Sequence, residues 1–129
     1  MGMILEGMIA TENMDGSVNA APMGPIVAAD FSRLTLRPFT TSTTYKNLSN
    51  QRRGVFHVLD DVLLIAQAAV GEAPTPALLP CPIGWGWVLA DACRWYAVEV
   101  RSIDDRDARS VIEADVVGSG SLRDFWGFN

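Results

Sequence analysis

Short β-compatible segments separated by turn signals run along most of this chain, and they restrict the folds open to it. Clusters of Gly, Pro, Asn and Asp interrupt the apolar runs. Strands are expected at residues 3–10, 18–23, 26–28, 33–39, 55–59, 85–89, 92–103 and 110–117. Helical patterns do not alternate regularly with these strands, so a parallel βαβ sheet is not expected. The pattern predicts a mainly-β fold, a small barrel with a few short helices.

The turn signals also predict how the strands are connected. Asp15-Gly16 favours the positive φ of a hairpin turn between the first two strands. Gly24-Pro25 indicates a bend or bulge. Four prolines between residues 72 and 82 indicate an ordered loop or a crossing connection, because proline cannot continue a helix. Gly118-Ser119-Gly120-Ser121 predicts a flexible segment after the last strand.

Two segments have a helical pattern. Residues 45–52 end in a cationic turn before Gly54, which is typical of a helix C-terminus with a glycine cap. A second helix is expected over residues 62–70, with Asp60 or Asp61 as its N-cap. The two aspartates are therefore interpreted as a cap rather than as a metal or acid pair.

Composition excludes several classes of protein. A chain of 129 residues with 49% apolar and 19% charged residues is sufficient for one globular domain. A net charge of −5 argues against general nucleic-acid binding, which needs a basic face. No apolar run approaches the ~20 residues of a membrane span. Cys81 and Cys93 do not have the spacing of a zinc site or a redox pair, so a reducing, cytoplasmic environment is expected. His57, the only histidine, lies in an apolar strand and is expected to be a hydrogen-bonded core residue.

One segment has the residue types of a phosphate site. Residues 34–45 read Leu-Thr-Leu-Arg-Pro-Phe-Thr-Thr-Ser-Thr-Thr-Tyr. Arg37 offers a planar fork of N–H donors, and five hydroxyl residues follow it. A helix that starts near Thr43 or Thr44 would add free backbone N–H groups and the positive end of its dipole. The alternative, an N-capped surface loop with an ordinary arginine, stays open on these residues alone.

Six blocks in the same order resemble an uncharacterised prokaryotic family, domain of unknown function 447. The blocks are Leu5-Glu6-Gly7, Asn19-Ala20-Ala21-Pro22-Met23-Gly24, Leu36-Arg37-Pro38-Phe39, Thr43-Thr44-Tyr45-Lys46-Asn47-Leu48, Asp60-Asp61-Val62-Leu63-Leu64 and Trp126-Gly127-Phe128-Asn129. The resemblance covers nearly the whole chain. It implies a split β-barrel of Greek-key type that binds FMN, the fold of flavin reductases and pyridoxamine-phosphate oxidases. Family members usually continue into further helices, so the chain is expected to be one FMN-binding domain, residues 1–129, shortened relative to them.

The resemblance also implies a cofactor site at the interface of a homodimer. Arg37 would hold the FMN phosphate with help from Thr41, Thr43, Thr44 and Lys46. Strand 19–24 would face the isoalloxazine edge. The predicted cofactor-binding residues are Asn19, Ala20, Ala21, Pro22, Met23, Arg37, Pro38, Phe39, Thr41, Thr43, Thr44 and Lys46. A plain edge strand with small residues is the alternative for the first five.

Three functions are compatible with this interpretation. FMN itself carries hydride or electrons, so the lack of a convincing catalytic triad or carboxylate pair suits an FMN-dependent oxidoreductase of flavin-reductase type. Its electron donor would be NADH, NADPH or another protein, although no G-x-G-x-x-G sequence is present. The first alternative is a non-catalytic flavin carrier or sensor. The second is a dimeric scaffold that has lost the cofactor. No catalytic residue and no metal ligand is predicted.

Overall fold

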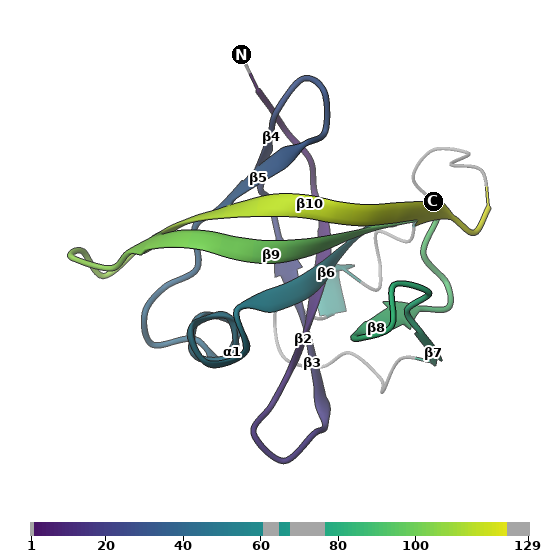
Figure 1. Ribbon diagram of the computed structural model, residues 1–129, viewed down its shortest axis with the longest axis horizontal. Helices are drawn as coiled ribbons and strands as arrows, with labels where there is room; N and C mark the ends of the chain where they lie inside the picture. The colour runs from purple at the N-terminus through teal and green to yellow at the C-terminus, as the bar shows by residue number, and fades with distance from the viewer. Residues whose placement is uncertain (1, 61–64, 68–76, 124–129) are drawn as a thin grey trace.

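The computed structural model describes residues 2–60, 65–67 and 77–123, and two antiparallel sheets make up most of this part (Figure 1). The larger sheet contains β1 (Met3–Ile4), β2 (Gly7–Glu12), β3 (Val18–Met23), β4 (Ile26–Val27), β5 (Arg33–Leu36), β6 (Arg53–Val58), β9 (Arg94–Asp104) and β10 (Val111–Ser121). The smaller sheet pairs β7 (Leu78–Pro80) with β8 (Trp87–Leu89). Helix α1 (Thr43–Gln51) connects β5 to β6.

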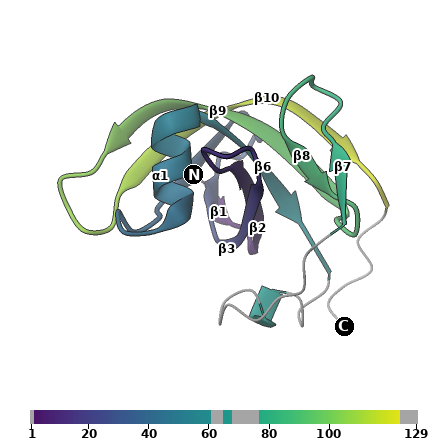
Figure 2. The ribbon, with the colours of Figure 1, turned by 90° about the horizontal axis from the view of Figure 1, so that it is seen from below.

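The larger sheet curls into a half barrel. Its strand order is β1-β4-β5-β10-β9-β6-β2-β3, and every pairing is antiparallel. Figure 2 shows β9 and β10 arching over the other strands, with α1 beneath one end of the arch and β7–β8 at the other. The predicted mainly-β, split-barrel class is confirmed. No helix in the described part of the chain has the length and apolar character needed to cross a membrane.

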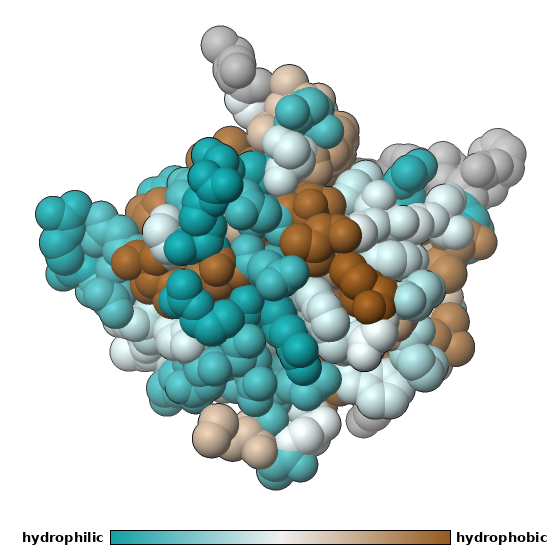
Figure 3. Space-filling view, viewed as in Figure 1, coloured by the Kyte–Doolittle hydropathy of each residue, from teal (hydrophilic) through white to brown (hydrophobic). Residues whose placement is uncertain are grey.

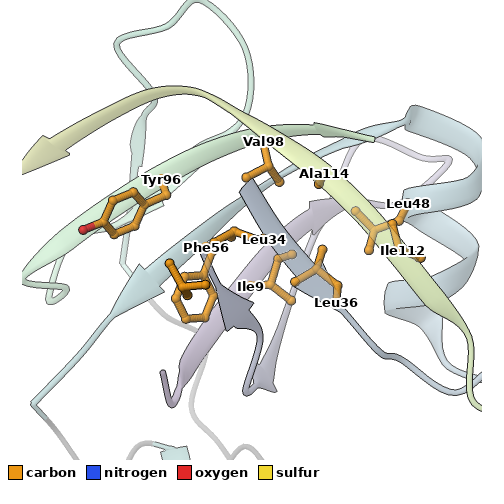
Figure 4. Packing of buried hydrophobic residues seen from close by; sticks show 10 residues of the cluster. Ile9, Leu34, Leu36, Leu48, Phe56, Tyr96, Val98, Ile112 and Ala114 are labelled. Atoms are coloured by element: carbon orange, nitrogen blue, oxygen red, sulfur yellow. The ribbon is translucent and has the colours of Figure 1, made fainter. Parts of the chain in front are cut away.

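The core fills the inside of the curved sheet (Figure 4). Its buried members are Ile9, Val27, Leu34, Leu36, Leu48, Phe56, Tyr96, Val98, Ile112 and Ala114. Side chains of β9 alternate between the two faces of the sheet, because Tyr96 and Val98 belong to this cluster while Trp95 and Ala97 pack on the other face against Val55 and Val88. Leu48 is the contribution of α1, and its full burial fixes that helix against the sheet.

The hairpin turn at Asp15-Gly16 is confirmed, but the first strand is not continuous. The Asn13 N–H donates to Ser17 O at 2.8 Å, and Gly16 has the positive φ of 87° that Asp-Gly predicted. The expected strand at 3–10 is divided into β1 and β2. The two parts pair with different partners, β1 with β4 and β2 with β3 and β6. Between them the chain crosses from one edge of the sheet to strands near the opposite edge.

Helix α1 begins where the hydroxyl-rich segment predicted and ends differently. Ser42 is the N-cap, and its Oγ accepts the Tyr45 N–H at 3.1 Å. The expected glycine cap at Gly54 is wrong, because Arg52 takes the left-handed conformation itself, with φ 62°. Strand β6 then starts at once with Arg53, which pairs with Glu99. Gly54 is therefore a strand residue, packed against Thr11 and Leu48.

Two predicted loops are partly strands. Leu78–Pro80, within the proline-rich segment, forms β7 because β8 supplies a pairing partner. The expected flexible segment at 118–121 continues β10, paired with β9 up to Ser121 and Arg94. Of the helix expected at 62–70, the structure describes only residues 65–67, which are helical. The rest of that helix, its cap at Asp61 and the C-terminal aromatic residues lie outside the described residues.

Candidate functional site

A surface pocket of about 260 Å³ lies between the end of β3 and the loop that joins β5 to α1. It is lined by Ala21, Pro22, Met23, Gly24, Arg37, Pro38, Phe39, Ser42, Thr44 and Arg109. Two segments that the sequence assigned to one cofactor site, the small-residue strand and the arginine-threonine loop, therefore meet at one place. Seven of the twelve predicted residues line it: Ala21, Pro22, Met23, Arg37, Pro38, Phe39 and Thr44.

The strand side of this pocket is the last strand in the sheet order. β3 pairs only with β2 among the described strands, so its outer edge carries backbone groups without a strand partner there. Pro22 has no N–H, and donors at this edge must come from its neighbours. Asn19 and Ala20 do not line the pocket. The Asn19 side-chain amide instead donates to Thr44 Oγ1 at 3.4 Å and connects the strand to the helix start.

The loop side of the pocket contains hydrogen-bond donors that the described protein leaves free. The first turn of α1 uses Ser42 for the Tyr45 N–H, and the Lys46 N–H donates to Ser42 O at 3.2 Å. No acceptor among the described residues takes the backbone N–H of Thr43 or Thr44. These two amides lie at the positive end of the helix dipole, and Thr44 lines the pocket, so this end of the pocket is suited to an anion.

Arg37 is exposed, and its guanidinium makes no hydrogen bond or ion pair with any described residue. It is therefore available for a ligand that approaches through the pocket. The other predicted phosphate helpers are placed less directly. Thr41, Thr43 and Lys46 are exposed positions close by in the chain, but their side chains do not line the pocket. The structure brings Arg37 and Thr44 together and leaves those three at the periphery.

Sequence reasoning missed Arg109, which enters the pocket from the end of the β9–β10 hairpin. Its Nε donates to the backbone oxygen of Arg37 at 3.0 Å, and its guanidinium carbon lies 5.4 Å from the centre of the Phe39 ring. No local motif marks this residue, because only the folded hairpin places it beside Phe39. Ser42 and Gly24 were also missed as lining residues, although both lie within segments that the sequence singled out.

The other candidate groups are structural. His57 is fully buried, with Nδ1 3.2 Å from Met8 O and Nε2 accepting the Leu89 N–H at 3.0 Å, which confirms a hydrogen-bonded core histidine. Burial lowers its pKa to about 4, so the ring is neutral near pH 7. Cys81 and Cys93 are buried free thiols that form no disulfide with each other. Burial raises the pKa of the Cys93 thiol.

A second hollow of about 400 Å³ shares no lining residue with the first. It lies beside β8 and is lined by Glu12, Arg53, Pro80, Cys81, Gly84, Trp85, Gly86 and Trp87. The Arg53 guanidinium stacks 5.0 Å from the centre of the Trp85 ring. Both tryptophans are therefore assigned to this hollow and not to the wall of the candidate site.

The comparison with protein families settles the affiliation of this chain. A family model described as "protein of unknown function (DUF447) N-terminal domain" matches residues 5–123. The chain belongs to this family. No curated protein matches the sequence.

Solved structures with the same fold include several flavoproteins. The FMN-bound DUF447 protein MM1853 from Methanosarcina mazei superposes with a TM-score of 0.75 at 22% identity, over 92% of this chain and 60% of that one. This DUF447 chain thus spans about three fifths of the length of that relative. The styrene monooxygenase flavin reductase from Pseudomonas putida S12 gives a TM-score of 0.77 at 16% identity, over 93% and 82% of the two chains. An FMN-binding protein from Thermus thermophilus gives 0.75 at 14% identity, over 91% and 71%. These likenesses establish the flavin-reductase split-barrel fold.

Proposed function

We propose that this DUF447 protein binds FMN in the pocket between β3 and the β5–α1 loop and is a flavin-dependent oxidoreductase of flavin-reductase type. One observation carries the proposal. The unengaged Arg37 guanidinium and Thr44, whose backbone amide is free, meet the open edge of β3 at a pocket of about 260 Å³. A cationic fork and a helix N-terminus suit a phosphate, and a strand edge with small residues suits a flat ring.

The roles of the residues follow from their positions. Arg37 and the first amides of α1 bind the phosphate, with Thr41, Thr43 and Lys46 as exposed neighbours that add donors or charge. Ala21 allows the ring to approach the β3 backbone closely, and the Asn19 amide holds Thr44 in place at 3.4 Å. Bound FMN supplies the hydride and electron transfer. The protein supplies binding, orientation and control of solvent access.

The proposal extends to partners. We expect a cytoplasmic homodimer whose electron donor is NADH, NADPH or another protein. Free outer edges on β1 and β3 leave room for a second subunit in the described part of the sheet. Structural neighbours add support, since one of them is described as an NADH:FAD oxidoreductase in complex with NAD and FAD fragments, from Streptomyces globisporus.

The first test is the absorption spectrum of the purified protein, followed by titration with FMN. The proposal expects the two-band spectrum of oxidised flavin, with FMN as the released chromophore. Arg37→Gln should weaken FMN binding about 10- to 100-fold, because a charge-assisted bond to phosphate contributes roughly 1.5–3 kcal/mol. Arg33→Gln is the matched control, since Arg33 begins β5, the strand that Arg37 directly follows, but pairs with Asp115.

Either of two results would contradict flavin binding at this site. If the protein is colourless and fails to take up added FMN, only the function of a cofactor-free scaffold remains. Equal FMN affinity of wild type and Arg37→Gln would show that FMN binds at another site. Anaerobic addition of NADH and NADPH to the flavin-loaded protein then separates the remaining functions, because a reductase bleaches the flavin bands and a carrier or sensor does not.

A further inference from the structure

Arg109 is held in a fixed position relative to the β5–α1 loop. The Thr40 N–H donates to Ala108 O at 2.9 Å, and the Ser110 N–H donates to Pro38 O at 3.0 Å. The Ser110 hydroxyl reaches the same Pro38 oxygen at 2.5 Å and is fully buried there. These bonds lie on both sides of the bridge between Phe39 and Arg109. The end of the hairpin is therefore attached to the loop that carries Arg37.

The Arg109 side chain is oriented as well as placed. Its Nε donates to the Arg37 backbone oxygen at 3.0 Å, and its guanidinium lies over the Phe39 ring. Its two terminal nitrogens make no hydrogen bond or ion pair within the described residues. A guanidinium that is fixed through Nε and a ring face presents its remaining donors in a defined direction with little loss of rotamer freedom.

No ion pair joins Arg109 to Asp104, Asp105 or Asp107, the acidic residues that precede it in the hairpin. Figure 3 shows the hairpin as a hydrophilic projection from the body of the molecule. Asp104 pairs with Arg106 at 2.7 Å, and Asp105 accepts the Tyr45 hydroxyl at 2.6 Å. Arg37 and Arg109 thus bring two positive charges to one pocket, and neither is in an ion pair among the described residues.

We propose that Arg109 is the second phosphate ligand and that the Arg37–Arg109 pair makes this site select a phosphate monoester. The inference rests on the proposed function and deepens it, because it names FMN over FAD and riboflavin as the preferred flavin. A phosphate monoester carries a charge of about −1.5 to −2 near pH 7. Each phosphate of FAD carries a single negative charge and riboflavin has none. Two guanidinium groups match the monoester best.

The test is a titration of wild type, Arg109→Gln and Arg109→Lys with FMN, FAD and riboflavin, followed by flavin fluorescence. Arg109→Gln should weaken FMN binding about 10- to 100-fold, as for the loss of a charge-assisted bond. It should weaken FAD binding less and leave riboflavin binding unchanged. Arg109→Lys should be intermediate, because lysine keeps the charge but loses the fork. Arg106→Gln is the control, since Arg106 lies on the same hairpin and pairs with Asp104.

Loss of FMN and riboflavin affinity by the same factor in Arg109→Gln overturns the inference, because it indicates packing rather than recognition of phosphate. Unchanged FMN affinity in this variant, with wild type binding FMN, overturns it as well and leaves the proposed function intact. A parallel titration with inorganic phosphate, read as a shift in thermal unfolding, covers the case in which wild type binds no flavin. A phosphate effect lost in Arg109→Gln and kept in Arg106→Gln then supports the inference, and no phosphate effect in wild type overturns it.

Discussion

The two hydrogen bonds of His57 require its imidazole ring to be neutral. Its Nδ1 lies 3.2 Å from Met8 O and donates to it, and its Nε2 accepts the Leu89 N–H at 3.0 Å. The ring, which lies on β6, therefore connects the neighbouring strand β2 to the small sheet through β8. Protonation of Nε2 would remove the acceptor for Leu89 and place a charge in a fully buried position. Burial accordingly lowers the pKa of His57 to about 4.

This depressed pKa predicts a loss of stability in mild acid. The folded-state pKa of about 4 lies below the ordinary histidine value of 6.5, so the contribution of His57 to stability is fully present above pH 6.5 and is lost as pH falls toward 4. Between pH 7 and pH 5 the free energy of unfolding should fall by about 2 kcal/mol on this account. Urea unfolding of wild type and His57→Gln at both pH values checks this. The same pH dependence in the two proteins would contradict it.

The residues of the candidate site were predictable only in part. Arg37 and Thr44 were identified because their local order, a strand, a cation and then a helix cap, has a direct chemical meaning. Asn19 was expected at the ring edge, and its amide turns instead to Thr44. Arg109 is separated from Phe39 by seventy positions of chain and pairs with it through a single bridge. No local pattern contains that relation, because the register of the β9–β10 hairpin sets it.

At the scale of elements, β10 shows why glycines were misread as flexible. Gly120 pairs directly with Trp95 across the ladder, and a Cβ there would lie 2.5 Å from the indole Nε1. A Cβ on Gly118 would lie 2.9 Å from the Ile83 side chain. Both glycines make room for large neighbours in an ordered strand. Composition alone indicates a loop, because the close approach comes from residues elsewhere in the chain.

Gly120→Ala should therefore destabilise the protein, by about 1–3 kcal/mol, since the new methyl group displaces the buried Trp95 indole. The near-UV circular dichroism of the tryptophans should change with it. Ser119→Ala is the control, because Ser119 is exposed on the same strand. Equal stability of the two variants would show that Trp95 moves aside without cost.

Local signals predicted the elements that depend on local chemistry. The β2–β3 hairpin and the start of α1 follow from Asp15-Gly16 and from Ser42, which act within a few residues. The division of β1 from β2 depends on the pairing of β1 with β4, and the strand β7 depends on its pairing with β8. These were not predicted, because a pairing partner is a property of the sheet and not of the segment.

At the scale of the whole molecule, the half barrel is joined by contacts between distant parts of the chain. Asp60, which is buried just after β6, forms a bidentate ion pair with Arg123, which follows β10. The Arg123 guanidinium also donates to Asp91 O at 3.0 Å. Asp60 thus acts through Arg123 to connect the middle of the chain to its end, a relation that the expected helix-cap role did not include.

Replacing Arg123 should lower the thermal stability more than replacing Arg106. Both arginines pair with an aspartate, but Asp60 is 4% exposed, whereas Asp104 is an exposed partner. Removing the cation that pairs with a carboxylate costs more folding free energy when the carboxylate is buried than when it is solvated. Thermal unfolding of wild type, Arg123→Gln and Arg106→Gln at neutral pH measures this. Equal losses in the two variants would show that the pair does not hold the barrel together.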